Sequence, residues 1–144
     1  GMRVLDAGSG PGRLAVPVAR AVAPGGEVVA LDAQEEMLRR LRERARGLPV
    51  RARRARLGVD GIDEGGFDRA LLAAVLGEVP ERVGALREVR RALSPRGLVV
   101  LAETALDPHY VPWRASVALA AEAGLRPVAT TCHAAGHVTT LSPA

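Results

Sequence analysis

The feature that most constrains the fold is the segment 4–12, Val-Leu-Asp-Ala-Gly-Ser-Gly-Pro-Gly, near the start of the 144-residue chain. Glycine fills every second position from Gly8 to Gly12, and glycine adopts positive φ without penalty and allows a ligand close to the backbone. An apolar strand that ends in such a loop and restarts as a helix leaves free amides at the helix start. These amides suit the polar or anionic parts of a cofactor.

A second acid follows the next apolar run, Val28–Leu31, at position Asp32. An acid at the tip of the second strand of a β-α-β unit is placed to accept hydrogen bonds from two ribose hydroxyls. The glycine loop and Asp32 together predict an adenosine-containing cofactor. A purely structural role for the glycines would require the loop and both acids to coincide by chance.

Glycine spacing indicates which cofactor. The dinucleotide fingerprint is G-x-G-x-x-G, whereas this chain has Gly8-x-Gly10-x-Gly12, with Asp6 two residues before the first glycine. This acid-x-G-x-G-x-G pattern resembles motif I of the class I methyltransferases, which use S-adenosylmethionine. A carboxylate at Asp6 suits the cationic amino-acid end of that cofactor and would repel a pyrophosphate.

Composition limits the remaining possibilities. The length fits a single domain over residues 1–144, the apolar content of 48% is ample for a core, and no apolar run could span a membrane. No signal peptide is recognisable, and a single cysteine, Cys132, excludes an internal disulfide, so we expect a cytoplasmic protein in which Cys132 is an ordinary half-buried strand residue. Three scattered histidines and one cysteine give no metal-ligand spacing.

All 20 basic residues are arginine, and the net charge is only +4, so the high pI is not an argument for nucleic-acid binding. The segment Val50–Arg56 is a predicted strand with four arginines. We interpret it as a solvated edge strand, because charge discourages edge-to-edge association. The alternative, a phosphate-binding stripe, is disfavoured because no aromatic residues interleave with the arginines to stack on bases.

Hydrophobic periodicity and Gly/Pro punctuation predict a regular alternation of elements. The predicted strands are 2–6, 27–32, 50–56, 67–73 and 98–102, the helices are 13–23, 34–46, 80–93 and 112–123, and a final antiparallel hairpin covers 126–132 and 137–142, with a loop over 57–66 and a turn over 94–97. This order predicts an α/β fold with a doubly wound sheet.

The whole chain is similar to the class I methyltransferases, and within them to the ubiquinone/menaquinone-type branch that acts on small molecules. The resemblance implies a Rossmann-like, mostly parallel sheet of strand order 3-2-1-4-5-7-6, with the last strand antiparallel. It is carried by motif I together with Phe67-Asp68, Leu71 to Pro80, the stretch Leu86 to Gly97, Glu103-Thr104, Asp107 to Tyr110, and Leu119 to Leu125.

The resemblance implies a role for individual residues. The methionine end of S-adenosylmethionine would be held by Asp6, Gly8, Ser9, Gly10 and the Ala73 backbone, the ribose by Asp32, and the adenine by Ala33 and Leu57. The reaction would be in-line methyl transfer to a small-molecule acceptor, leaving S-adenosylhomocysteine. His109 and Tyr110 are candidate bases near the carboxyl edge, although a simple turn is the favoured interpretation; His133 and His137 are expected in exposed loops.

Two departures from the family pattern matter. Relatives usually carry an acid that reads the adenine amino group at the position of Arg56. They also place several dozen helical residues before the first strand, which cover the cofactor. We therefore expect either a truncated chain or a cover supplied by a partner or a second copy in a homo-oligomer.

Three other functions remain open. A non-catalytic cofactor-binding or scaffold protein on the same fold would explain the missing cover and Arg56. An NAD-dependent oxidoreductase is disfavoured by the glycine spacing and the final hairpin, and an RNA methyltransferase is weaker still. Methylation of nucleobase amines is disfavoured because Ala73-Ala74-Val75-Leu76 replaces the Asn/Asp-Pro-Pro-aromatic motif.

Overall fold

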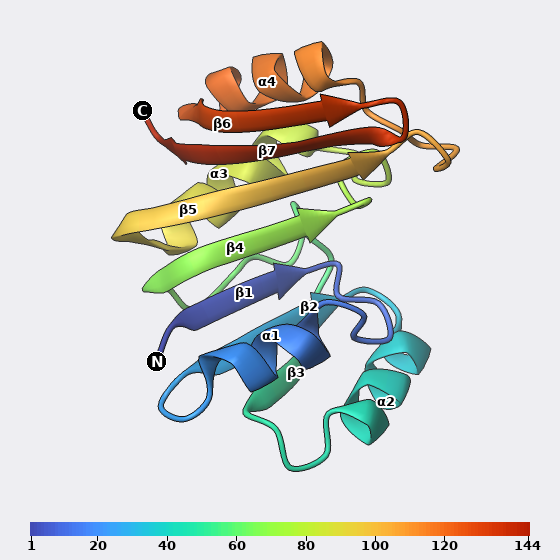
Figure 1. Ribbon diagram of the computed structural model, residues 1–144, viewed down its shortest axis with the longest axis vertical. Helices are drawn as coiled ribbons and strands as arrows, with labels where there is room; N and C mark the ends of the chain where they lie inside the picture. Colours follow the sequence, from blue (N-terminus) through green and yellow to red (C-terminus); the bar gives the residue numbers. More distant parts are fainter.

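The computed structural model describes residues 1–144, which form seven strands and four helices (Figure 1). In chain order they are β1 (Arg3–Ala7), α1 (Ala15–Val22), β2 (Glu27–Asp32), α2 (Glu35–Arg44), β3 (Val50–Arg54), β4 (Phe67–Ala73), α3 (Arg82–Ala92), β5 (Leu93–Thr104), α4 (Trp113–Glu122), β6 (Leu125–His133) and β7 (Gly136–Pro143). The loop expected over 57–66 contains no helix or strand.

All seven strands belong to one sheet with the order β3-β2-β1-β4-β5-β7-β6. The first five strands are parallel neighbours, and β7 inserts antiparallel between β5 and β6. The predicted fold class and strand order are therefore confirmed. The arginine-rich strand β3 is indeed an edge strand, as its charge predicted.

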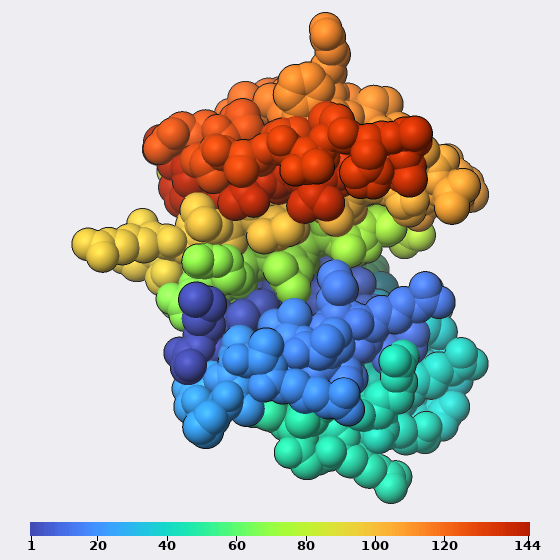
Figure 2. Space-filling view, viewed as in Figure 1, coloured from blue at the N-terminus to red at the C-terminus, as the bar shows by residue number.

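Helices cover the two faces of the sheet unequally. On one face, α1 and α2 bury Ala15, Ala19 and Leu41 against the strand residues Val4 and Val28. In Figure 1 α1 lies in front of the lower strands, and no helix lies in front of β5 and β7. Strands β5 and β7 therefore form part of the front surface in Figure 2. Several apolar residues of the two strands are only half-buried, namely Leu98, Val100 and Ala102, and Val138 is exposed.

The larger core lies on the opposite face. There α3 and α4 contribute Leu86, Val89 and Ala120, which pack against sheet residues such as Leu72 and Leu101. These are the apolar faces that helical periodicity predicts for the two segments. None of the four helices is both long enough and apolar enough to cross a lipid bilayer.

Element boundaries differ from the sequence prediction mainly at β5. The predicted turn over 94–97 is extended, so β5 begins at Leu93 rather than Leu98. Leu93 pairs with Phe67 before a register shift, and the carbonyl of Phe67 lies so close to Gly97 that a side chain there would clash. The start of β5, in yellow, projects from the body at the left edge of Figure 2, and Pro95 and Arg96 are exposed there. All four helices and β3 are each two or three residues shorter in total than predicted.

Two predictions about the final hairpin are wrong. Cys132 is exposed rather than half-buried, because β6 is the outer edge strand and nothing covers it at this point. His137 is buried rather than exposed in a loop, because β7 is an inner strand and its imidazole points under the start of α4. His133 is exposed as expected, although it lies at the end of β6.

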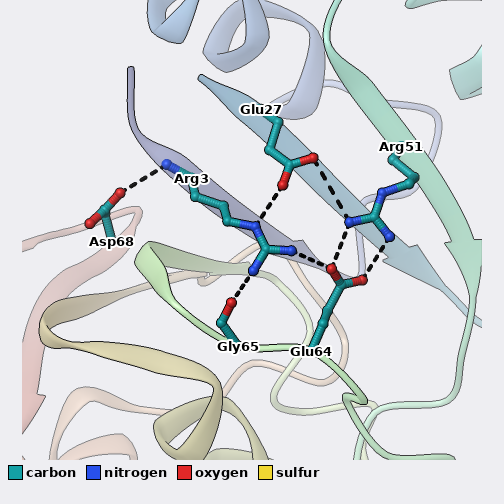
Figure 3. Close-up of polar contacts among 6 residues, drawn as sticks. All are labelled: Arg3, Glu27, Arg51, Glu64, Gly65 and Asp68. Carbon is teal, nitrogen blue, oxygen red and sulfur yellow. Dashed lines mark hydrogen bonds and ion pairs between the residues drawn. The ribbon is translucent and has the colours of Figure 1, made fainter. Parts of the chain in front are cut away.

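A network of ion pairs closes the amino end of the sheet (Figure 3). The Arg3 guanidinium pairs with Glu27, 2.6 Å away, and with Glu64, while its backbone amide donates to Asp68 at 2.9 Å. Arg51 reaches the same Glu64 carboxylate with two nitrogens at 2.9 and 2.6 Å. These contacts attach the loop before β4 to β1, β2 and β3.

Candidate functional site

The candidate site lies at the end of the sheet opposite the ion-pair network, where the carboxyl ends of the parallel strands meet. Ligands of open α/β sheets bind at this edge, near the point where the strand order reverses. Here that point lies between β1 and β4, because the chain runs outward to β3 on one side and to β5 on the other. The loops after β1, β2 and β4 therefore lie next to one another.

The glycines of the loop after β1 have different physical roles. All three have positive φ, 78° at Gly8, 52° at Gly10 and 86° at Gly12. A side chain at Gly8 would overlap Val75, and one at Gly12 would come within 2.8 Å of Leu41. A side chain at Gly10 would meet no atom within 4 Å. Gly8 and Gly12 thus permit close packing, whereas Gly10 faces open space in which a ligand can approach the backbone.

The amides within the glycine loop, residues 8–12, are not free, whereas the sequence predicted free amides only at the start of the following helix. Gly8 and Ser9 both donate to the Leu31 carbonyl at 2.8 Å, Gly10 donates to the Asp32 carboxylate, and Gly12 donates to the Ser9 carbonyl. Proline at position 11 has no amide hydrogen. Every amide of the loop therefore has an acceptor within the chain. Such a loop is a poor cradle for a phosphate, which favours a cofactor without one in this place.

Asp32 organises the tips of β1 and β2. One of its oxygens accepts the Gly10 amide and the other accepts the Gln34 amide, each at 2.8 Å. A carboxylate offers about four lone-pair sites, so two remain for outside donors. Because the residue is only half-buried, those sites are accessible. The geometry fits a pair of neighbouring hydroxyl groups such as those of a ribose.

Asp6 is an uncompensated acid beneath the loop. It is 2% exposed, and its Oδ2 atom has no hydrogen-bond partner. The Ser9 hydroxyl, also buried, has none either. Burial is the main cause that raises the pKa of Asp6 to about 7, with the charge of Asp32 adding to it and the backbone amide of Ala15 opposing it. A cationic group nearby would restore the charged form, so these residues fit the ammonium and sulfonium of S-adenosylmethionine.

The expected adenine side of the site lies at the tips of β2 and β3. The Ala33 carbonyl accepts Arg54 Nε at 3.1 Å, and Leu57 packs, half-buried, at the edge of the core. Arg56 does not reach toward the glycine loop. Its guanidinium forms two hydrogen bonds to Asp60, at 3.0 and 2.7 Å, and this pair lowers the pKa of Asp60 to about 2.

Ala73, the last predicted cofactor contact, opens onto a hollow of about 290 Å³ at the ends of β4, β5 and β7. Its walls are mostly small and apolar: Ala73, Ala74, Ala102, Ala135 and Val138. Ala74 is the one non-glycine residue with positive φ, 54°, and its amide donates to the Ala102 carbonyl at 2.8 Å. Residues held in this strained region cluster at functional sites.

Glu103 is a site residue that our sequence reasoning missed. It is the second-last residue of β5, is 5% exposed, and has one oxygen without a partner while the other accepts the Val111 amide at 3.4 Å. Burial raises the pKa of its carboxyl above the ordinary value, with Asp107 adding to the effect and His137 opposing it. The signal was available, because Glu103 follows an apolar strand just as Asp6 and Asp32 do.

The two candidate bases lie beside the hollow rather than in its wall. Tyr110 faces His137, with ring centroids 6.3 Å apart, and the backbone of His109 lies close against Gly77. The amide of His109 donates to Asp107 at 2.7 Å, as in a turn. The structure therefore agrees with the turn interpretation of this segment, and brings His133 and His137 to the hollow instead.

Comparison with known proteins agrees with this geometry. A family model described as "Methyltransferase domain" matches residues 4–97. An uncharacterised 37.1 kDa protein encoded in transposon TN4556 of Streptomyces fradiae is 35% identical over 108 residues, covering 74% of this chain and 31% of that protein. The demethylmenaquinone methyltransferase of Staphylococcus carnosus (strain TM300) is 31% identical over 105 residues, covering 72% of this chain and 44% of that protein.

The chain thus spans less than half the length of the curated relatives it matches. Among solved structures, a SAM-dependent methyltransferase from Aquifex aeolicus superposes with a TM-score of 0.90 at 20% identity, over 99% of this chain and 82% of that one. The fold agrees over almost the whole chain, and the family model covers the glycine loop, Asp32 and the tip of β4. The chain belongs to the methyltransferase-domain family.

Proposed function

We propose that this chain binds S-adenosylmethionine and transfers its methyl group to a small-molecule acceptor. The observation that carries the proposal is the arrangement of two carboxylates, from Asp6 and Asp32, around a glycine loop whose amides are already used. This arrangement supports a cationic, hydroxyl-bearing ligand over a pyrophosphate. Membership of the methyltransferase-domain family supports the same reaction.

Each residue has a specific task in this proposal. Asp6 compensates the positive charge of the amino-acid end, Asp32 accepts hydrogen bonds from the ribose hydroxyls, and Gly10 leaves room for the ligand against the backbone. Gly8, Ser9 and the Ala73 backbone complete the methionine side, while Ala33 and Leu57 line the adenine side. When bound, the cofactor supplies an electrophilic methyl group. The protein orients the acceptor and excludes water, which can contribute roughly 7–11 kcal/mol.

The acceptor is proposed from a relative and from the site together. The Staphylococcus carnosus relative is named for a quinone, demethylmenaquinone. The hollow beside Ala73 has small apolar walls and a volume of about 290 Å³, which suits a compact ring. A small ring compound of the quinol or phenol type is therefore the acceptor class that we propose.

The proposal also includes the location of the protein in the cell and a cover for the open face of the sheet. A single cysteine is compatible with the reducing conditions of the cytoplasm, where we place the protein. The half-exposed apolar surface over β5 and β7 supports a cover by a partner or a second copy of the chain.

Calorimetric titration with S-adenosylhomocysteine tests the proposal. We expect the Asp32→Ala variant to bind about 10- to 100-fold more weakly than the wild type, because a hydrogen bond to a charged acceptor is worth about 1.5–3 kcal/mol. Asp63→Ala is the matched control, since Asp63 lies on the loop before β4 and pairs only with Arg53, at 2.8 Å. Equal affinity in all three proteins, or no binding to the wild type, would refute the proposal.

A further inference from the structure

The hollow beside Ala73 is formed by three segments that are distant in sequence. Ala73 and Ala74 come from the end of β4, Ala102 from β5, and Ala135 and Val138 from the hairpin between β6 and β7. The backbone of Ala105 donates to the Ala135 carbonyl at 2.9 Å, which fixes the hairpin to the end of β5. The hairpin therefore contributes to the same space as the proposed cofactor contact Ala73, and Ala102 lies between them, paired with Ala73 on one side and with Val138 on the other.

Most polar groups of the hollow are already engaged. The buried His137 uses one ring nitrogen with Thr139, at 3.3 Å, and the other with the Val111 carbonyl at 3.1 Å. The Thr104 hydroxyl lies 3.5 Å from the amide of Leu106. These contacts leave two side chains of the wall with unused hydrogen-bonding capacity, Glu103 and His133.

Those two side chains differ in accessibility. The unpartnered oxygen of Glu103 is completely buried, so a ligand reaches it only if the surrounding atoms move. His133 is exposed and lies in the wall of the hollow, and its imidazole forms no hydrogen bond within the chain. Histidine is the side chain most often used as a general base. His133 is thus the accessible base that faces this space.

We propose that His133 removes a proton from a hydroxylated aromatic ring bound in the hollow, and so makes that ring the nucleophile. This inference rests on the function proposed above. The small alanine walls suit a flat ring, and a ring hydroxyl supplies the proton. No other titratable side chains line the hollow besides Glu103 and His137, both of them buried. His133, rather than His109 or Tyr110, is therefore the base of this site.

The electron balance of the step is simple. The O–H bond of the ring breaks, its proton goes to a ring nitrogen of His133, and its electron pair stays on the acceptor. The acceptor oxygen, or a ring carbon made electron-rich by it, forms the new bond to the methyl carbon. The sulfur–methyl bond breaks with its pair going to sulfur, and the proton passes from His133 to solvent. Methylation at oxygen is then complete. Methylation at carbon needs one further step, in which the methylated ring carbon loses its hydrogen as a proton to solvent, the C–H electron pair restores the aromatic ring, and the ring oxygen takes up a proton from water.

Binding of 2-naphthol without cofactor tests the assignment. The ionised form of this probe absorbs at longer wavelength, so its apparent pKa on the protein can be read by absorbance. We expect the wild type to lower that pKa by about one unit, since the imidazole becomes positive when it takes the proton of the ring hydroxyl and then stabilises the oxyanion beside it. In His133→Asn the shift should disappear. Thr131→Asn is the matched control, because Thr131 is exposed on the same strand and does not line the hollow; it should keep the shift.

The remaining outcomes decide between this inference and the proposed function. The analogue 2-methoxynaphthalene, which has no acidic hydrogen, should bind wild type and His133→Asn equally well. A shift that survives in His133→Asn, or that disappears in His109→Asn instead, overturns the role of His133. So does the absence of naphthol binding to the wild type. If S-adenosylhomocysteine binds normally in that same preparation, the proposed function stands while the inference fails.

Discussion

Acidic side chains at the two ends of the sheet differ in whether they are paired with arginine. At the amino end, Glu27 and Glu64 each form ion pairs with the same two arginines, Arg3 and Arg51. At the carboxyl end, Asp6 and Glu103 are buried, each with one oxygen that has no partner. No arginine pairs with either acid, although the chain contains 20 arginines.

The difference separates acids that support the fold from acids that are available to a ligand. An uncompensated buried carboxyl costs stability, whereas a paired surface carboxyl is neutral or slightly favourable. A chain that has arginines for the amino end but none for Asp6 leaves that charge for something outside the chain. Strained Ala74 adds to the cost at the same edge. Local departures from the rules of stable folding are expected at functional sites.

The largest expected effect is at Asp6. Its pKa is about 7 when folded and near 3.8 ordinarily, so between these values the unfolded chain loses a proton that the folded chain keeps. The free energy of unfolding therefore falls as pH rises through this range. Asp6→Asn stays neutral at every pH. We therefore expect its free energy of unfolding, measured relative to that of the wild type, to be roughly 3–5 kcal/mol higher at pH 8 than at pH 4. Urea unfolding at both pH values measures this change and cancels any pH-independent cost.

The same variant should bind S-adenosylhomocysteine more weakly, because the ammonium of the ligand loses its counter-charge. A variant that is both more stable at pH 8 and weaker in binding would sharpen the contrast between the two ends. A pH-independent difference in stability between Asp6→Asn and wild type would contradict the charge state that we assign to this residue.

A smaller effect of opposite sign is expected at the amino end. Glu64→Ala removes the carboxylate that Arg3 and Arg51 share, and the Glu64 side chain is 20% exposed. We expect a loss of about 1–2 kcal/mol in the free energy of unfolding, because several partly exposed pairs are lost together. The loss should shrink in 1 M salt. Affinity for S-adenosylhomocysteine should be unchanged; a large drop in affinity would show that the two ends are not independent.

The sequence predicted which residues lie at the carboxyl ends of the strands, but not the hydrogen bonds that these residues form with one another. Strand order and the position of Asp32 follow from local patterns, namely apolar runs that end in an acid or in glycine. The Gly8 and Ser9 amides donate to the Leu31 carbonyl because the ends of the neighbouring strands β1 and β2 lie side by side in the folded sheet. No local pattern contains that information, so the sequence alone could not predict which loop amides are already used.

The hairpin shows the same limit. His133 and His137 both stand next to the turn, and the sequence gives no reason to treat them differently. Insertion of β7 between β5 and β6 buries His137 and leaves His133 at an edge. Likewise, Pro95 and Gly97 are ordinary turn residues, but pairing of Leu93 with Phe67 keeps the segment extended. Tertiary pairing, rather than propensity, decides these positions.

The smallest expected effect concerns Arg56. Its partner Asp60 is paired with arginine, like the acids of the amino end, but both residues belong to the carboxyl end, beside the proposed adenine side. Removing the guanidinium in Arg56→Ala frees the Asp60 carboxylate to accept a hydrogen bond from the adenine amino group. Because the pair is exposed, we expect affinity for S-adenosylhomocysteine to rise by no more than about fivefold. S-inosylhomocysteine, which carries an oxygen in place of that amino group, should gain nothing. An equal gain for both ligands would instead indicate a general charge effect, and a loss for both would mean that Arg56 itself contacts the ligand.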